Sequence, residues 1–165
     1  MAERFDPEVE RMLLAAGWRP GREVARMVSK WESRLAPTEG AMPEVARKVL
    51  TEFGGLSVGQ WGVGEYRGRG SVEFDPVKAL GESDRGPVLG QRVYPLGETD
   101  FGHGFLFAVE TVGIWSWSID HTFRQLGRDI GEALNCQLLG RRPLQEIPAT
   151  GIAGEAEPSS DIPER

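Results

Sequence analysis

The chain has one cysteine among its 165 residues, Cys136, so it cannot form an intrachain disulfide. It also lacks any apolar run long enough to span a bilayer. Its first residues, Met-Ala-Glu-Arg-Phe-Asp, contain no apolar core of a signal peptide. The sequence therefore predicts a protein of the cytoplasm that makes no membrane contact.

Histidine is almost as scarce, since only His103 and His121 occur. A zinc site needs about four ligands, and these two residues and Cys136 show no metal-binding spacing. Residues 59 to 70 are rich in glycine. They lack the Gly-Lys-Ser/Thr of a phosphate loop and the strand and helix that flank a dinucleotide fingerprint. We therefore expect neither a metal nor a cofactor.

Positive charge is in deficit, and the net charge is −6. The deficit is largest in residues 54 to 120, which carry five cations and nine anions. An acidic middle argues against direct binding of nucleic acid and favours a basic protein partner.

Helix signals occupy the first third of the chain. Asp6-Pro7-Glu8 is typical of a capped helix start. Trp18 follows a glycine stop and is placed to fold back on that helix. Residues 22 to 36 carry a one-sided apolar stripe, and Pro37 is expected to end this second helix. A third helix is expected from Pro43 to Phe53.

The stretch Thr51-Glu52-Phe53-Gly54-Gly55-Leu56 links the helices to the strands. We expect Gly54 to take a positive φ just past the helix end and Gly55 to allow a second backbone to pass nearby. Phe53 is then predicted to lie where the helical layer meets the sheet.

Strand patterns dominate after Leu56. Residues 59 to 70 are expected to form a loop or ragged edge strands, and residues 71 to 74 and 88 to 96 to form strands. Residues 105 to 119 read as a hairpin that turns at Gly113. Residues 121 to 126 are expected to connect this hairpin to a closing helix over residues 128 to 139.

The predicted class is therefore α+β, with N-terminal helices, a meandering and mainly antiparallel β-sheet and a C-terminal helix. Residues 1 to 140 are expected to form one domain. Residues 141 to 165 are rich in proline and acidic residues, so we expect a disordered tail there.

No group of residues makes a convincing catalytic site. Asp120-His121 could act as a base with an orienting carboxylate, but a polar pair at a strand end is the simpler interpretation. Cys136 fits a small buried thiol better than a nucleophile. Glu73 and Asp75 could form an acid–base pair, although a solvated acidic edge explains them as well. We therefore predict that the protein is not an enzyme.

Aromatic and acidic residues give the stronger indication of function, because tryptophan and tyrosine anchor protein interfaces and charge complementarity speeds association. Trp115 and Trp117 share a face of the predicted hairpin, which we expect to pack under helices. The predicted partner-binding residues are Trp61, Glu65, Tyr66, Glu73, Asp75, Glu98 and Asp100.

Four blocks together resemble the third subfamily of the SUKH superfamily of bacterial immunity proteins. They are residues 9 to 21, residues 52 to 56 (Glu-Phe-Gly-Gly-Leu), residues 94 to 119, which begin Tyr-Pro-Leu-Gly-Glu, and residues 126 to 134. Their order and spacing carry the resemblance over about residues 5 to 140. The glycine-rich loop with Trp61 and Tyr66 and the tail after Gly140 depart from it.

This resemblance implies an α+β domain that stays in the cytoplasm and neutralises a cognate protein toxin of a polymorphic toxin system by binding it. Such toxins are often nucleases or deaminases. The four blocks are mostly structural, so they transfer no toxin-contact residue. Two alternatives remain: an adaptor of the same fold that binds an endogenous protein, and an enzyme that uses Asp120 and His121.

Overall fold

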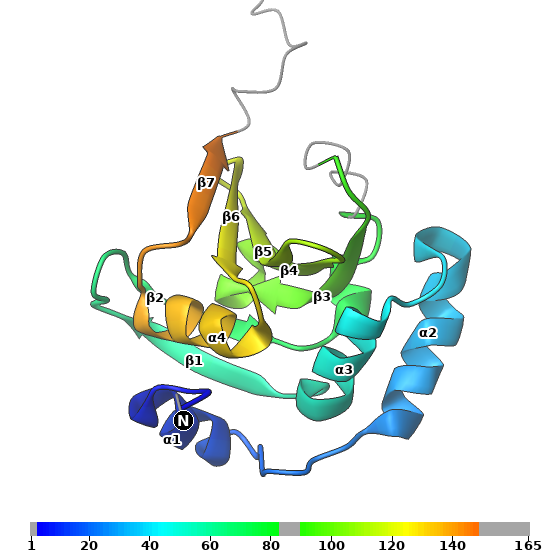
Figure 1. The fold of residues 1–165 in the computed structure, drawn as a ribbon, viewed down its shortest axis with the longest axis horizontal. Coiled ribbons are helices and arrows are strands. Elements are labelled where there is room, and N and C mark those ends of the chain that lie inside the picture. The colour runs from blue at the N-terminus through cyan, green and yellow to red at the C-terminus, as the bar shows by residue number, and fades with distance from the viewer. Residues whose placement is uncertain (1–2, 83–89, 149–165) are drawn as a thin grey trace, which may run out of the picture.

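A computed structural model describes residues 3–82 and 90–148, and it confirms the α+β class (Figure 1). The helices are α1 (Pro7–Ala15), α2 (Ala25–Glu39), α3 (Glu44–Phe53) and α4 (Ile130–Leu139). The strands are β1 (Ser57–Gly62), β2 (Arg69–Glu73), β3 (Val93–Thr99), β4 (Gly104–Val109), β5 (Gly113–Ser118), β6 (Thr122–Gly127) and β7 (Gln145–Pro148). Short 3₁₀ helices, η1 (Pro76–Ala79) and η3 (Asp100–Gly102), follow β2 and β3.

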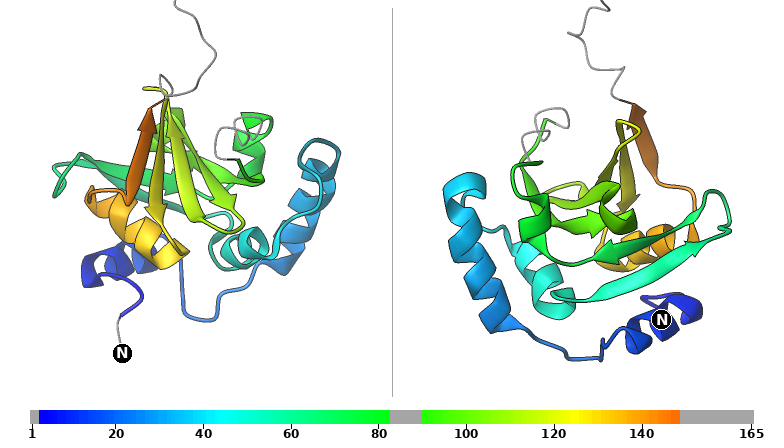
Figure 2. Two further views of the ribbon diagram at one scale, coloured as in Figure 1. Left: turned by 45° about the horizontal axis from the view of Figure 1, so that its top comes forward. Right: turned by 180° about the vertical axis from the view of Figure 1, so that it is seen from behind.

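The seven strands form one antiparallel sheet in the order β1-β2-β3-β4-β5-β6-β7. Each strand therefore pairs with its neighbour in sequence, and the sheet twists strongly from one edge to the other (Figure 2). In Figure 1, α1 lies below β1, and α2 lies outside α3, at the far side of the molecule from the β1–β2 hairpin. Because neighbouring strands run in opposite directions, the connections β1–β2, β3–β4 and β5–β6 all lie at the same end of the sheet.

Alternation along the strands divides the apolar side chains between two clusters. Tyr94, Leu106 and Ile114 face the helices and belong to the larger cluster. Phe107, Trp115 and Trp117 belong to the second cluster, which receives no residue from α1 to α4. The expectation that Trp115 and Trp117 lie under helices is wrong. Both are buried, but on the opposite face of the sheet. Side chains alternate between the two faces along a strand, and both residues lie an odd number of positions from Ile114, which faces the helices.

Several local predictions are confirmed. The Asp6 side chain caps α1 by accepting a hydrogen bond from the Glu8 N–H at 3.0 Å. Trp18 folds back on α1, since its backbone N–H donates to the Leu13 carbonyl and its ring meets Phe5 edge-on at 5.5 Å. Gly113 has φ 89° at the turn between β4 and β5. These features depend on short-range geometry, which a sequence pattern reports well.

The positive φ predicted for Gly54 is found at Gly55 instead, whereas the second backbone predicted beside Gly55 is present. Gly54 has φ −51°, and a Cβ built on it would lie 2.7 Å from the Trp31 ring. Gly55 has φ 81° and donates its N–H to the Phe74 carbonyl. Phe53 lies as predicted at the junction of helix and sheet, fully buried and stacked on Phe74 at 5.4 Å.

Three boundaries differ from the prediction. Pro37 lies inside α2, which continues to Glu39, because its missing N–H falls in an exposed last turn where the lost bond costs little. Residues 121 to 126 are not a connection, since β6 occupies residues 122 to 127. The predicted disordered tail is wrong for residues 145 to 148, which pair with β6 as β7. Residues 88, 89 and 149 to 165 lie outside the described residues.

Replacement of Gly54 by alanine tests the close approach of α2 to the end of α3. We expect Gly54→Ala to lower the free energy of unfolding by about 1–3 kcal/mol, because the new methyl group would collide with Trp31 and with the Leu50 carbonyl. Urea unfolding measures this. Gly68→Ala is the matched control, since a Cβ there meets only the Gly62 carbonyl at 3.7 Å. Equal effects for the two variants would contradict the proposed contact.

Candidate functional site

A hollow of about 470 Å³ lies where three connections of the sheet converge. Trp61 and Arg67 reach it from the β1–β2 hairpin, His103 from the segment after η3, and Ile119 from the turn between β5 and β6. We call this hollow the aromatic groove. The charged side chains that line it are Arg67, Arg69, Asp100, Asp120 and Arg124.

Some of the large apolar side chains that the fold leaves in water either line the aromatic groove, as Trp61 and Ile119 do, or stack on a lining residue, as Phe101 does. Trp61, Phe101 and Ile119 are 63%, 64% and 67% exposed. Phe101 stacks on Trp61 at 6.4 Å, and His103 meets the same indole edge-on at 6.3 Å. In the described part of the chain, the exposed Phe, Trp and Tyr residues are Trp61, Phe101 and Tyr66. Tyr66 belongs to the β1–β2 hairpin, which also carries Trp61. Exposed aromatic clusters of this kind mark surfaces that bind other proteins.

Backbone strain is concentrated around the same groove. Asp100, Phe101 and His121 have φ values of 53°, 56° and 60°, and they are the non-glycine residues with positive φ among residues 3–82 and 90–148. Each costs of order 1–3 kcal/mol, and such residues collect at functional sites. The Asp100 carboxylate accepts bonds from the Ser71 N–H and the Gln137 amide, both at 3.1 Å, which hold the strained segment in place.

The hairpin that carries Trp61 is tied to the end of α4. The N–H groups of Tyr66 and Arg67 bond to the Gly140 carbonyl at 2.8 and 2.9 Å, and the Glu65 N–H bonds to the Leu139 carbonyl at 3.1 Å. A helix leaves its last carbonyls without partners, so the hairpin satisfies groups that would otherwise need water. This loop therefore has a defined position, which its glycine content does not suggest.

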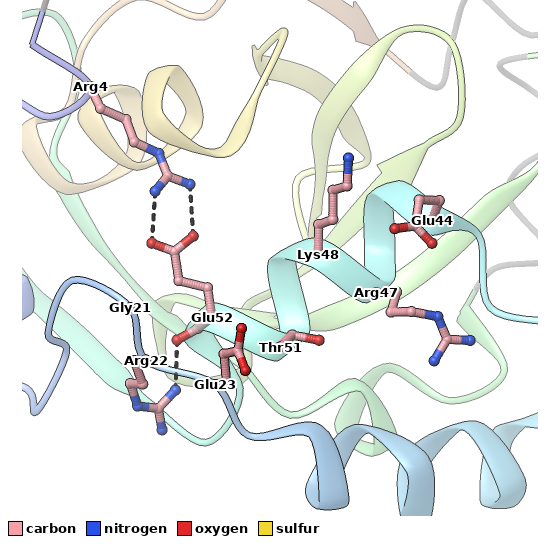
Figure 3. Close-up of a pocket in the computed structure, with 9 residues that line it drawn as sticks. All are labelled: Arg4, Gly21, Arg22, Glu23, Glu44, Arg47, Lys48, Thr51 and Glu52. Carbon is pink, nitrogen blue, oxygen red and sulfur yellow. Dashed lines mark hydrogen bonds and ion pairs between the residues drawn. The ribbon is translucent and has the colours of Figure 1, made fainter.

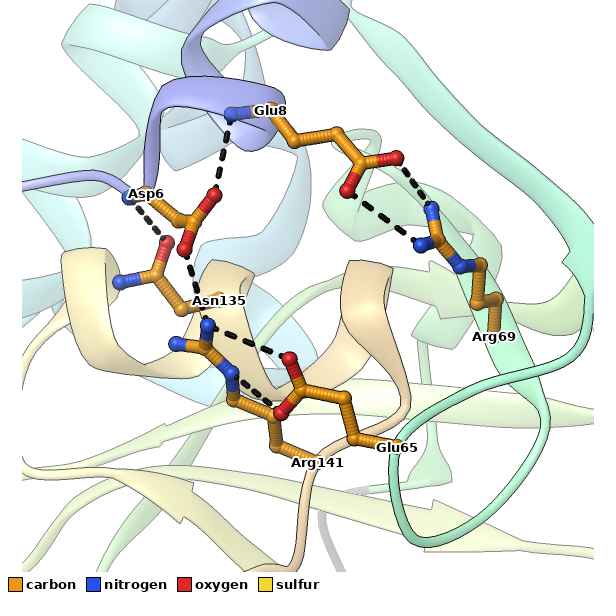
Figure 4. A network of polar contacts seen from close by, with 6 residues as sticks. All are labelled: Asp6, Glu8, Glu65, Arg69, Asn135 and Arg141. Carbon is orange, nitrogen blue, oxygen red and sulfur yellow. Dashed lines mark hydrogen bonds and ion pairs between the residues drawn. The ribbon is translucent and has the colours of Figure 1, made fainter.

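A polar network fastens the same hairpin to α1 (Figure 4). Arg69 pairs with Glu8 at 2.7 Å, and Arg141 pairs with Asp6 at 2.9 Å and with Glu65 at 2.8 Å. The bond from Arg69 holds the pKa of Glu8 below its ordinary value of 4.5. The pKa of Asp6 is also lowered, chiefly by the Glu8 N–H and then by Arg141. Both carboxylates are therefore charged at neutral pH.

The predicted pair Asp120-His121 lies at the rim of the groove in an arrangement that does not favour catalysis. The Asp120 carboxylate accepts bonds from Arg124 at 2.6 Å and from the Thr122 N–H at 3.1 Å. Burial works to raise the pKa of Asp120, but the bonds from Arg124 and Thr122 outweigh it and the pKa is lowered. The His121 ring packs on Trp117 at 5.6 Å. Asp120 thus supports an arginine rather than a histidine base.

Cys136 also fits a structural role. It is buried, and burial raises the pKa of its thiol, which keeps it protonated at neutral pH. Within residues 3–82 and 90–148 no three histidine, cysteine or acidic side chains are grouped so that they could hold a metal ion.

The predicted partner-binding residues occupy separate places. Trp61 and Asp100 line the aromatic groove, and Tyr66 lies beside it under the guanidinium of Arg142 at 4.6 Å. Glu65 is engaged in the network of Figure 4.

The other three lie around η1. Glu73 and Glu98 are cross-strand neighbours that share Lys78, at 2.8 and 3.5 Å, and Asp75 caps η1. A partner role for all seven residues stays a prediction, although they do not form one continuous acidic surface. Sequence reasoning missed Phe101 and Ile119. The available signals were an apolar residue in a glycine-rich loop for Phe101 and an apolar residue at the end of a predicted strand for Ile119.

A second hollow, of about 560 Å³, lies between the N-terminal segment, the α1–α2 connection and α3 (Figure 3). Its charged groups hold these segments together. Arg4 makes two bonds to Glu52, at 2.7 and 2.9 Å, and Arg22 donates to the carbonyls of Glu52 and Gly54. Because its main polar groups are already used between segments, this hollow is a weaker candidate than the aromatic groove.

Comparison with known proteins gives one match. The family model described as "SUKH-3 immunity protein" matches residues 5–140. Neither the curated proteins nor the solved structures contain a significant match. Among the described residues, no helix combines the length and the hydropathy that a membrane crossing requires.

The ion pair between Glu8 and Arg69 predicts a dependence of stability on pH. Because the pKa of Glu8 is lowered in the folded state, its contribution is complete above its ordinary pKa of 4.5 and is lost as the pH falls through the folded value. We expect Glu8→Gln to lower the melting temperature at pH 7 and to converge with the parent protein toward pH 3. Thermal unfolding across this range checks it.

Glu10→Gln is the matched control for this experiment. Glu10 is an exposed carboxylate on the same helix that makes no ion pair in the part of the chain that the structure describes. A gap between Glu8→Gln and the parent protein that stayed constant with pH would contradict the role given to the ion pair.

Proposed function

The chain belongs to the SUKH-3 immunity protein family, and we propose that it binds a cognate protein toxin and neutralises it without catalysing a reaction. The observation that carries the proposal on the structural side is the aromatic groove. It presents Trp61 and Ile119 to water, and the exposed Phe101 stacks on Trp61 beside it. Tight protein inhibitors place anchors of this kind at the centre of their interfaces.

The groove is also held in the shape in which it would bind. The hairpin with Trp61 is bonded to the end of α4 and to α1, and Asp100 fixes the segment that carries Phe101. A preorganised surface loses little conformational entropy on binding, which favours high affinity. Strain at Asp100 and Phe101 is consistent with a surface shaped for contact rather than for stability.

Finer features of the function belong to the same proposal. The toxin would be an intracellular poison such as a nuclease or deaminase of a bacterial polymorphic toxin system, and the immunity protein would meet it in the cytoplasm of the producing cell. The net charge of −6 would speed the approach of a basic toxin. Glu65 and Glu73 contribute less to this attraction, because they pair with Arg141 and Lys78 respectively.

Co-expression tests this function directly. The protein is produced with the C-terminal domain of the large secreted protein encoded beside it, and growth of the host is scored. We expect the immunity protein to restore growth. The double variant Trp61→Ala, Phe101→Ala should lose protection and weaken affinity by a factor of about 100 or more, because two exposed anchors are removed. Titration calorimetry with the purified domains measures the affinity.

Met27→Ala and Leu144→Ala are the controls, since they remove partly exposed apolar side chains that do not line the groove. Both should protect as the parent protein does. A toxic neighbour that is not rescued would refute the immunity role for that pair and favour an adaptor that binds an endogenous protein. Rescue that survives the double variant would place the interface elsewhere.

A further inference from the structure

One cation in the aromatic groove has no partner of opposite sign in the part of the chain that the structure describes. Arg67 lines the groove, and none of the ion pairs within residues 3–82 and 90–148 includes it. Its guanidinium donates from Nη2 to the Gln137 amide oxygen at 2.9 Å, and it also interacts with the buried Cys136 thiol. Its Nε is buried and bonds to nothing. A half-buried guanidinium in this state retains capacity to bind an acceptor.

Of the other charges that line the groove, Arg69 and Arg124 are neutralised within the protein, whereas Asp100 accepts two hydrogen bonds and enters no ion pair among the described residues. Arg69 pairs with Glu8 at 2.7 Å, and Arg124 pairs with Asp120 at 2.6 Å and with Glu146 at 3.1 Å. Arg67 is therefore the cation that this surface offers to a ligand, and its sign is opposite to that of the whole protein.

The structure also holds Arg67 in position. Its N–H is bonded to the Gly140 carbonyl. Gln137, which is 2% exposed, accepts the guanidinium bond and donates its own amide to Asp100 at 3.1 Å and to the Ser71 carbonyl at 3.3 Å. The orientation of the Gln137 amide is thus set from both ends. A buried glutamine used in this way orients the arginine without cancelling its charge.

We propose that the aromatic groove binds a partner segment in which a carboxylate side chain stands beside a large apolar one. The carboxylate binds Arg67, and the apolar side chain packs against Trp61 and Ile119. This inference rests on the proposed function and specifies the chemistry of the toxin surface at its contact. The toxin can be basic overall and still place an acidic residue here, because the groove selects by local charge.

The argument for this occupant is charge complementarity joined to apolar area. Guanidinium and carboxylate form two parallel hydrogen bonds in a fixed geometry, which an ammonium group cannot reproduce. A partner that covers Trp61 and Ile119 also excludes water from Arg67 beside them. The lower local dielectric strengthens an ion pair with Arg67. A basic segment would place a like charge beside Arg67, which is unfavourable.

Selection of random peptides displayed on phage tests the chemistry without knowledge of the toxin. The full-length protein is the bait. We expect enriched sequences to carry Asp or Glu next to Trp, Phe, Leu or Met. A synthetic peptide of the enriched sequence should bind at least about tenfold more weakly to Arg67→Gln, and Arg67→Lys should recover only part of the loss. Its affinity should fall as salt is raised.

Two controls keep a folding defect apart from a loss of binding. Arg34→Gln makes the same change of charge on an exposed arginine of α2 and should bind the peptide as the parent protein does. Peptides in which Asp or Glu is replaced by Asn or Gln leave the protein untouched and should lose the same factor of about ten. Enrichment without acidic residues, no enrichment at all, or equal binding by Arg67→Gln would overturn the inference.

The outcome separates this inference from the proposed function. If peptides behave as expected but no toxin is rescued, the groove chemistry stands and the immunity role fails. If the toxin is rescued and Arg67→Glu binds it as tightly as the parent protein, the immunity role stands and this inference fails. If Arg67→Glu loses protection, changing single acidic residues of the toxin to arginine should restore it at one position.

Discussion

The bonds between the end of α4 and the β1–β2 hairpin are the constraint on which the binding surface depends. The carbonyls of Leu139 and Gly140 accept three N–H groups from residues 65 to 67. Those carbonyls need partners because a helix ends there, and a positive φ of 63° at Gly140 turns them toward the hairpin. A single cap therefore closes the helix and positions Trp61 and Arg67 at the same time.

The sheet supplies the second half of that surface. Its strands are antiparallel and follow one another in sequence, so the connections β1–β2, β3–β4 and β5–β6 meet at one end. Each face of the sheet buries its own apolar cluster, with Tyr94 and Ile114 on the helical face and Trp115 and Trp117 on the other. Burial on both faces makes the sheet a rigid support. The groove loops can then hold strained residues such as Asp100 and Phe101, because the stability of the fold is provided elsewhere.

Charge has a different role in this protein from the one that its composition suggests. Most acidic residues of the predicted partner site are committed to internal contacts: Glu65 to Arg141, Glu73 and Glu98 to Lys78, and Asp100 to Ser71 and Gln137. Among the cations that line the groove, Arg67 is the one without an ion-pair partner in the described residues. Net charge governs approach over long distances, whereas individual unpaired groups govern what fits at contact.

The sequence by itself determined the α+β class, the cap at Asp6, the hairpin turn at Gly113 and the place of Phe53, because each follows from short-range periodicity or from the conformational needs of one residue. It also indicated Trp61 as an exposed anchor. Only the tertiary structure decided which face of the sheet holds Trp115 and Trp117, and which glycine after α3 takes the positive φ. The same is true of β6, which pairs with both β5 and β7, and of the short β7, which pairs with β6. The aromatic groove belongs to this second group as well. Its residues come from three connections far apart in the chain, and no local pattern reports a partner that lies dozens of residues away.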